Sequence, residues 1–540
     1  MRWRCPILQI LRERNSMMRQ YPLLIALLII MSCGLWSESG RCQEAQLDSL
    51  AARLEWISYR LEMERWERSV TGESDSLAFF ESLYAYTLSD SQIRSLIQKT
   101  RSGSAGEIER RKAAIIERLS RRYVVDGYQP AAGLIDSLVE AFSVSRYEFE
   151  GGPALRSAVE NIMFTDASRG RREQAYRALV AAGEELAEPM SRLFRLRNQQ
   201  ARREGFNNYF SLLLDAHAMG VDEYRELLAT IDELTIDAYR SLVTQLESRL
   251  RVERVEPWDL QYAYRNIMAD VDARLNADTL MPLADMSFQA IGVTLDELPI
   301  YYRLFDGTTG GGTFEAFLVR PPFDQRITGV RQGGHRHMRR LLSETGLALY
   351  GANIRQEEAV FQRPLPGPFM QAMAEFFGLF ADDARWLSEY AGLPEQVTAD
   401  YISARRDLVL IELRQALVQQ YFEIEAYSDP NQDLNLLYWR LWENHMLLPR
   451  HDDLKPWATQ LDYVIAPAST KDRLLGRIIA AQTWDYLERF NGSVLDNRDT
   501  RSFLIQNYYR FGRRYGWPEL VKRGTGETID PSFLVKHLGF

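Results

Sequence analysis

The chain has 540 residues, 46% of them hydrophobic, and is therefore long enough to bury a large core. It carries 65 lysine and arginine residues against 74 aspartate and glutamate residues, which gives a formal net charge of -9 at pH 7. The sequence has neither a basic stripe nor a block of like charges, so we expect no nucleic-acid partner. Composition alone does not decide how many domains the chain forms.

The first 33 residues have the layout of a secretory signal peptide. Arg19 precedes an apolar run from Tyr21 to Met31, which is too short for an ordinary membrane-spanning helix of about 20 apolar residues. The sequence Ile-Met-Ser-Cys that ends at Cys33 resembles a bacterial lipoprotein box. We therefore predict export to the bacterial periplasm or outer membrane, with a lipid anchor on Cys33. A plain signal peptide or a short uncleaved anchor is the alternative.

The rest of the chain is predicted to form one large domain. All three cysteines, Cys5, Cys33 and Cys42, lie near the N-terminus, so the exported body has no disulfide and no thiolate ligand for a metal. We predict a polar linker over 34–45 and a single helical domain over 46–540, because the sequence contains no internal repeat and no low-complexity linker.

Helical periodicity dominates this body. Leucine and isoleucine recur every three or four residues over 47–61, and a similar apolar stripe covers 224–234. Five further segments have the same amphipathic period: 107–124, 131–143, 171–200, 401–426 and 471–490. These patterns predict an all-α fold.

The segment 301–330 departs from the helical pattern. An apolar run is followed by the glycine-rich stretch Gly310–Gly312, by a second run with alternating side chains over 313–318, and by Pro321-Pro322. This pattern predicts a small antiparallel β-ribbon near 301–328. The glycine spacing fits neither a phosphate-binding loop nor a dinucleotide fingerprint.

The sequence VRQGGHRHMRRLL, residues 330–342, contains two closely spaced histidines. Zinc peptidases of the H-E-x-x-H type place two histidines four residues apart, about 40° around a helix, so that both bind one metal ion while the glutamate activates water. His335 and His337 are two residues apart, roughly 200° around a helix, and cannot hold one ion from a regular helix. Gly333 and Gly334 each weaken a helix interior by about 1 kcal/mol relative to alanine, so we expect the helix to begin at His335. The remaining histidines lack ligand-like neighbours and are expected to serve packing or surface roles: His217, His445, His451 and His537.

The wider sequence resembles the zinc oligopeptidases related to angiotensin-converting enzyme and to the oligoendopeptidase F and thimet oligopeptidase group. GTFEAFLVRPPFDQRI, residues 312–327, precedes the histidines as a ribbon precedes the zinc helix in that family, and GPFMQAMAEFFGLFADDARWL, 367–387, is similar to the helix that supplies a glutamate as third ligand. Other segments follow in the family's order, from WISYRLEMERWERSVTGESD, 56–75, to GRRYGWPELVKRGTGETIDPSFLVKHLG, 512–539. The resemblance implies a two-lobed helical gluzincin fold with a deep central groove.

The resemblance also implies a degenerate metal site. The first zinc histidine falls on Gly333, the catalytic glutamate on Gly334, the second histidine on His337 and the third ligand on Gln371. Glu375 matches a supporting acid one turn later, with its backbone about 6 Å further along the helix axis. We therefore expect no metal cofactor, and zinc would be bound only through unusual ligands. The two glycines would also open space in the cleft.

The side chains expected to stabilise the tetrahedral intermediate are missing as well. In the family, a histidine and tyrosines near the C-terminal part of the cleft have this role. The histidine position falls on Asp462 or Tyr463, and the tyrosine positions fall across Ser469, Thr470 and Arg473. Loss of a general base alone typically costs a factor of roughly 10²–10⁴ in rate. We therefore expect no catalytic residue at any of these positions.

These substitutions predict a catalytically inactive homologue, a pseudopeptidase that binds a peptide or partner protein in the retained groove. The predicted groove residues are His335, Arg336, His337, Gln371, Glu375 and Arg473. Arg336 or Arg473 would supply positive charge for a carboxylate, whereas Arg339 and Arg340 are expected to be solvated. Two alternatives stay open: an active zinc dipeptidyl carboxypeptidase or oligopeptidase with unusual metal ligands, and an envelope scaffold with a vestigial groove.

Overall fold

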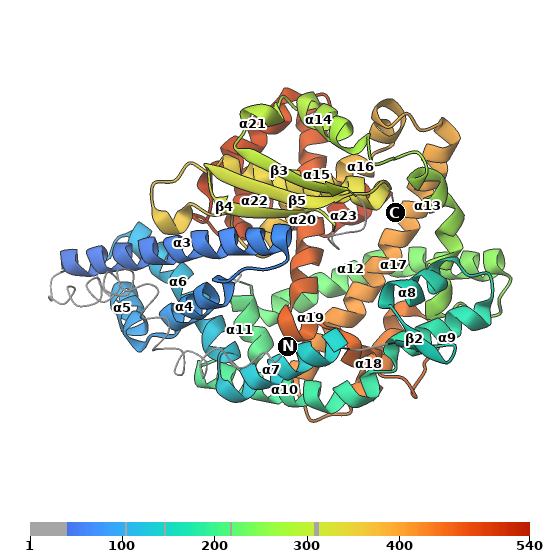
Figure 1. Cartoon of the computed structure of the whole chain (residues 1–540), viewed down its shortest axis with the longest axis horizontal. Helices are drawn as coiled ribbons and strands as arrows, with labels where there is room; N and C mark the ends of the chain where they lie inside the picture. Colours follow the sequence, from blue (N-terminus) through green and yellow to red (C-terminus); the bar gives the residue numbers. More distant parts are fainter. Residues whose placement is uncertain (1–39, 103–104, 145–146, 216–218, 307–312, 540) are drawn as a thin grey trace.

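The computed structural model describes residues 40–102, 105–144, 147–215, 219–306 and 313–539, and helices form most of it (Figure 1). The predicted signal peptide with Cys33 and the glycine-rich stretch Gly310–Gly312 lie outside these residues. The predicted linker is helical from Gly40, where α3 begins. In the described part of the chain, no helix is both long enough and apolar enough to cross a membrane.

The first half of the chain follows the predicted helical periods with one exception. Its helices and strands are α3 (Gly40–Thr71), α4 (Leu77–Ser89), α5 (Ser91–Ser102), α6 (Glu107–Asp126), α7 (Gln129–Val144), β1 (Tyr147–Phe149), β2 (Gly152–Ala154), α8 (Arg156–Thr165), α9 (Arg169–Val180), α10 (Gly183–Arg203), α11 (Tyr209–Asp215) and α12 (Val221–Leu250). The pattern over 171–200 forms two helices rather than one. The break is tied to tight packing at the start of α10, where a Cβ on Gly183 would lie 2.2 Å from the carbonyl oxygen of Lys455.

The second half contains the sheet and the central helices. Its elements are α13 (Arg265–Asp272), α14 (Leu280–Ala290), β3 (Ile300–Asp306), β4 (Glu315–Arg320), β5 (Asp324–Arg331), α15 (His335–Ala352), α16 (Pro368–Ala381), α17 (Glu395–Ser428), α18 (Leu434–Met446), α19 (Asp462–Ile465), α20 (Ser469–Asn491), α21 (Arg498–Asn507), α22 (Trp517–Thr525) and α23 (Ser532–His537). Helix α16 packs between α15 and α20, and buried aromatic rings join them. Phe376 and Phe380 both contact Trp484 of α20 with ring centroids less than 6 Å apart.

The predicted β-ribbon is a mixed three-stranded sheet with the order β3-β5-β4. The antiparallel part is β4 with β5, but β3 runs parallel to β5 and does not form a hairpin with β4. Strand β5 is the central strand of the sheet, and it is buried over most of its length. Gly329 in this strand allows the ring of Phe314 to approach, since a Cβ there would lie 2.3 Å from the ring. Helices α3 and α15 both pack against β4 and β5.

The helices form two groups joined by long helices, and they confirm the predicted all-α class. Figure 1 shows the sheet, α14, α15 and α21 at the top of the view and α7, α10 and α18 at the bottom. The long helices α17 and α20 extend from one group toward the other. The residues predicted to form a functional site lie on α15, α16, α19 and α20, except Gly333 and Gly334, which come just before α15.

Candidate functional site

The two glycines lie just before α15. As predicted, the helix begins at His335, and Gly334 has a positive φ of 111° that glycine adopts readily. The N–H of Gly334 donates to the carbonyl oxygen of Leu275 at 2.6 Å, and the backbone N–H of His335 donates to Asp272 at 2.8 Å. A Cβ on Gly333 would lie 2.6 Å from the same Leu275 oxygen. The glycines therefore do not open a cleft, because the segment after α13 packs against them.

Helices α15 and α16 run antiparallel, which separates the two metal-ligand positions predicted to face each other. The side chain of Arg339, near the start of α15, donates to Asp382 just beyond the end of α16. Near the other end of α15, the ring of Tyr350 packs edge-on against the first turn of α16. His337 and Gln371 are thus on the order of 15–20 Å apart along the helix axes, at 1.5 Å per residue. The sequence-based register does not bring them together.

His335 points into the core, so its predicted groove-binding role is wrong. Its Nε2 lies 2.9 Å from the carbonyl oxygen of Ala381, 2.7 Å from the hydroxyl of Tyr401 and 3.3 Å from the carboxylate of Asp382. The residue is buried. These contacts of the imidazole ring hold the start of α15 against the end of α16.

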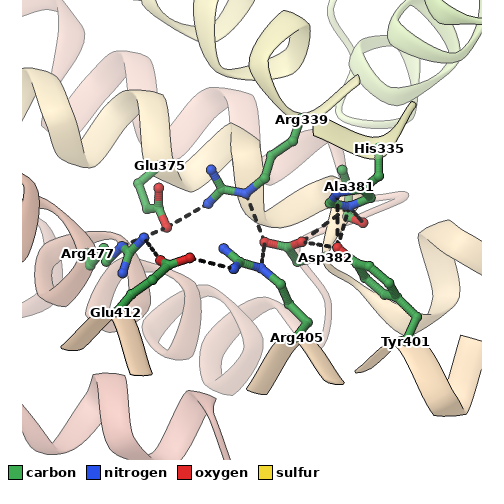
Figure 2. A network of polar contacts seen from close by, with 9 residues as sticks. All are labelled: His335, Arg339, Glu375, Ala381, Asp382, Tyr401, Arg405, Glu412 and Arg477. Carbon is green, nitrogen blue, oxygen red and sulfur yellow. Dashed lines mark hydrogen bonds and ion pairs between the residues drawn. The ribbon is translucent and has the colours of Figure 1, made fainter. Parts of the chain in front are cut away.

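A closed ring of alternating charges, here called the charge ring, connects α15, α16, α17 and α20 (Figure 2). Three arginines and three carboxylates follow one another around it: Arg339, Glu375, Arg477, Glu412, Arg405 and Asp382. Arg477 closes the ring, because it hydrogen-bonds Glu412 and lies 3.6 Å from Glu375. Burying one charge costs several kcal/mol unless it is well paired. Here each member has an opposite charge on both sides, and the six charges sum to zero.

Arg339 and Arg405 share Asp382 at one side of the charge ring. Arg339 donates to Asp382 at 2.9 Å and to Glu375 at 2.7 Å. Arg405 donates to Asp382 at 3.3 Å and to Glu412 at 3.2 Å. Because the two arginines come from α15 and α17, Asp382 fixes the end of α16 to both helices.

The charge ring keeps its carboxylates ionised. Burial would raise the pKa of Asp382, but Arg405 and Arg339 outweigh it and hold the pKa well below its usual value. Burial also opposes ionisation of Glu412, yet Arg477 and Arg405 lower its pKa to about 2. Both carboxylates therefore stay charged at any pH near neutrality.

Sequence reasoning missed the charge ring. The predictions of a solvated Arg339 and a groove-facing Glu375 are wrong, since their side chains are only 20% and 18% exposed and bond each other. Arg340 does remain half exposed. One signal was present: Glu375 interrupts the apolar stretch MAEFFGLF, and an acid on a buried face requires a cationic partner. The sequence does not say which of its many arginines supplies it.

Glu344 on α15 is a buried carboxylate at the edge of the sheet. Its Oε2 accepts a hydrogen bond from the backbone N–H of Ala316 at 2.7 Å, and its Oε1 pairs with Arg340 at 2.8 Å. Burial raises the pKa of Glu344 to about 7, although Arg340 and the Ala316 N–H oppose the shift. This carboxyl therefore titrates near neutral pH.

Side chains cover the outer edge of β4, which lies at one end of the strand order. Every second residue of an edge strand directs its backbone groups away from the sheet. Three side chains hydrogen-bond these groups. Arg340 donates to the Phe314 carbonyl oxygen at 3.0 Å, and Arg363 donates to the Leu318 carbonyl oxygen at 2.9 Å. Glu344 accepts a hydrogen bond from the Ala316 N–H at 2.7 Å. A peptide that adds a strand to a sheet needs such groups free. The edge is closed to strand addition at these positions.

Gln371 and Arg473 are accessible, and their role as groove residues stays a prediction. Gln371 is exposed where α16 approaches α20. Arg473 is half exposed and donates to Asp462 at 3.1 Å and to Thr470 at 2.9 Å. The structure thus brings together three of the degenerate positions near the start of α20. Tyr463 is different, because its ring is buried in the core.

Arg336 and Arg473 do not converge on one ligand carboxylate. Arg336 is exposed in the first turn of α15, near the end of α16, whereas Arg473 lies near the start of α16. Helix α16 has 14 residues and is therefore about 20 Å long. His337 beside Arg336 is half-buried, and burial together with the neighbouring guanidinium lowers its pKa.

The arrangement of the helices matches solved peptidases. The M32 carboxypeptidase of Deinococcus radiodurans R1 aligns with a TM-score of 0.61 and 14% identity, over 92% of this chain and 98% of that chain. A carboxypeptidase of Pyrococcus furiosus gives 0.63 and 14%, over 94% and 99%. PZ peptidase A, solved with an inhibitor, gives 0.69 and 14%, over 93% of both chains.

This chain has a helical peptidase fold. No protein-family model and no curated protein matches its sequence. At 14% identity, the likeness to the solved peptidases establishes the fold and leaves the chemistry to the residues of this chain.

Those residues do not fit the zinc ion that the sequence resemblance implies. An open zinc site needs three protein ligands, drawn from histidine, cysteine and carboxylate side chains. Of Gly333, His337 and Gln371, only His337 offers such a ligand. Within the described ranges, no group of three or more histidine, cysteine, aspartate or glutamate side chains is placed to hold a metal ion.

Replacing Asp382 with asparagine should strongly destabilise the fold. The amide leaves Arg339 and Arg405 without their shared counter-charge, and breaking a buried pair typically costs about 3–5 kcal/mol. Denaturant unfolding followed by circular dichroism measures this loss. The control is Glu389→Gln, which breaks an exposed pair with Arg385 and should change the unfolding free energy by about 0–1 kcal/mol. Equal effects of the two substitutions would contradict a stabilising charge ring.

Glu344→Gln should gain stability relative to the wild type as the pH rises. The pKa of Glu344 is about 7 in the folded chain against 4.5 in the unfolded chain, so the folded state binds the extra proton between these values. Wild-type stability contributed by this group therefore falls as the pH rises through that window. Urea midpoints at about pH 5 and pH 8 measure the change. The same difference between the midpoints of variant and wild type at both pH values would contradict a raised pKa of Glu344. Glu357→Gln, which replaces an exposed acid, is the control.

Proposed function

We propose that this chain is a pseudopeptidase: a non-catalytic relative of the zinc oligopeptidases related to angiotensin-converting enzyme and to the oligoendopeptidase F and thimet oligopeptidase group. It would bind a peptide or a partner protein. The helical peptidase fold supports the relationship. The observation that carries the proposal is the set of side chains on the facing sides of α15 and α16, which lacks a zinc ligand set.

We infer from the antiparallel packing that the degenerate motif lies in the second half of α15. Gln371 lies level with this part of the helix, because Phe369, two residues before it, packs against Tyr350. Ser343 faces the same helix further along, close to Gly378. The position four residues later on the same face is Leu347, and the residue after Ser343 is the buried Glu344. In this register the sequence SETGL, residues 343–347, aligns with H-E-x-x-H. Glu344 keeps the glutamate, and Ser343 and Leu347 replace the two histidines.

The chemistry of this second register is also unsuited to metal-assisted hydrolysis. Ser343 offers a neutral hydroxyl, Leu347 offers no donor atom, and Gln371 offers a neutral amide, so the metal has no charged or imidazole ligand. Without the metal, the Lewis acid and the activated water are both lost. Glu344 survives, but Arg340 and the backbone of β4 occupy its carboxylate oxygens. A retained general base that cannot reach a bound water does not catalyse.

Ligand binding in this proposal depends on Gln371 and Arg473, because both remain accessible on neighbouring helices. A peptide would contact these side chains and would not add a strand to the covered edge of β4. The same covered edge favours a second candidate, an envelope scaffold in which the groove is vestigial. A leader that ends at Cys33 supports an exported, lipid-anchored location for either function.

Metal analysis of the purified chain tests the loss of catalysis. We expect wild-type chain to hold far less than one zinc ion. The triple variant Ser343→His, Leu347→His and Gln371→Glu should approach one zinc ion per chain, because it rebuilds a three-ligand site. Gln371→Glu alone, which restores only the ligand paired with His337 in the sequence-based register, should stay free of zinc. Near-stoichiometric zinc in the wild type, removed by a chelator together with peptidase activity, would overturn the proposal.

Peptide binding is tested with a synthetic library of random hexapeptides. Mass spectrometry of the fraction retained by immobilised chain should detect bound peptides. Gln371→Trp fills the accessible position and should lower retention by about tenfold or more. Gln261→Trp, at an exposed glutamine elsewhere, is the matched control and should retain peptides as the wild type does. A folded wild-type chain that retains no peptide would contradict groove binding and leave the scaffold function.

A further inference from the structure

A pocket of 230 Å³ lies beside the charge ring, between α16, α17, α20 and α23. Four members of the charge ring form one wall: Glu375, Asp382, Arg405 and Arg477. These side chains neutralise one another within the ring, so they contribute polarity without an unpaired charge. The pocket lining includes neither Gln371 nor Arg473, which makes it a site separate from the proposed groove.

Two opposite charges at this pocket lack an ionic partner among the residues that the structure describes. One carboxylate oxygen of Asp383 accepts hydrogen bonds from the backbone N–H groups of Arg385 and Trp386, each at 2.9 Å. Its second oxygen stays available to a ligand. Arg406 is exposed at the rim. A Cβ on Gly539 would lie 3.2 Å from the Cζ of Arg406, so glycine there leaves room for the guanidinium. The pocket therefore offers one carboxylate and one guanidinium to a ligand.

The remaining wall is apolar and aromatic. Trp484 and His537 pack edge to face with ring centroids 5.9 Å apart. Ile402, Leu534 and Leu538 complete this side. Across the described residues, the His537 ring has no hydrogen-bond partner in the protein, so a polar ligand atom can use its ring nitrogen. An apolar group of a ligand would be buried here beside the two free charges.

We propose that this pocket binds a free α-amino acid with an apolar side chain. The ammonium group pairs with Asp383, the carboxylate pairs with Arg406, and the side chain lies against Trp484. Ligand pockets for drug-sized molecules span about 300–1,000 Å³, and the smaller volume here suits a single amino acid better than a peptide. Charge-assisted bonds at both ends give the site its selectivity, because a ligand that lacks either charge leaves one protein charge unpaired.

Isothermal titration of the purified chain with L-leucine and L-phenylalanine tests the site. We expect saturable binding of at least one of them, with about tenfold weaker affinity for its amide, which lacks the carboxylate, and for its N-acetyl form, which lacks the ammonium. Asp383→Asn keeps the oxygen that caps the Trp386 N–H, and Arg406→Gln keeps a polar rim. Each should lower affinity for the free amino acid by about tenfold. Glu389→Gln, at an exposed pair outside the pocket, should bind as the wild type does.

The two substitutions also assign each end of the ligand. Asp383→Asn should no longer distinguish the amino acid from its N-acetyl form, and Arg406→Gln should no longer distinguish it from its amide. Absence of binding by folded wild-type chain would overturn the proposal, as would affinities unchanged in both variants. Binding of inorganic phosphate with the same dependence on Arg406, but with no dependence on Asp383, would reduce the site to a simple anion site. None of these outcomes depends on whether the groove binds peptides.

Discussion

Neutralisation of buried charge is the constraint on which the centre of this molecule depends. Three arginines and three carboxylates from four helices lie together (Figure 2), largely removed from solvent except for Glu412, which is 41% exposed, and the desolvation of each is offset only if both neighbours stay in place. This requirement fixes the relative positions of α15, α16, α17 and α20 more tightly than apolar packing alone, since a shifted helix would leave a charge unpaired. Breaking one contact therefore disturbs the packing of the four helices that the charge ring joins.

Two regions near the charge ring differ in chemistry. In one, Gln371 and Arg473 are accessible, and Glu344 is held by Arg340 and by the sheet. The other is a small pocket with an aromatic wall and with two charges that have no ionic partner among the described residues. Arginines that satisfy carboxylates inside the protein leave no cluster of acids and histidines for a metal within the described chain. The peptidase fold is thus retained while its interior is organised around ion pairs.

The fold class was predictable from the sequence, but the alignment of its helices was not. Amphipathic periods identify helices such as α3 and α12, because the period depends only on which face of each helix is apolar. The period does not show which residues of two neighbouring helices lie at the same height along their axes. The sequence alone therefore could not show that His337 and Gln371 are far apart. Arg339 was equally ambiguous: a basic residue in RHMRRLL is usually solvated, and only its contacts with Glu375 and Asp382 identify it as buried. Adjacent strands in the sequence likewise suggested a hairpin, whereas β5 inserts between β3 and β4.

The covered edge of β4 has a consequence for the behaviour of the chain among its own copies. An edge strand with free N–H and C=O groups is a template for pairing with another molecule, and natural proteins block such edges with charged side chains. Arg340, Glu344 and Arg363 place charged groups on this edge and occupy its backbone hydrogen-bonding positions. Arg363 is itself paired with Glu55 of α3 at 2.8 Å, so the cover is anchored to the longest helix of the N-terminal region. These side chains therefore protect the sheet against aggregation through strand pairing at high local concentration.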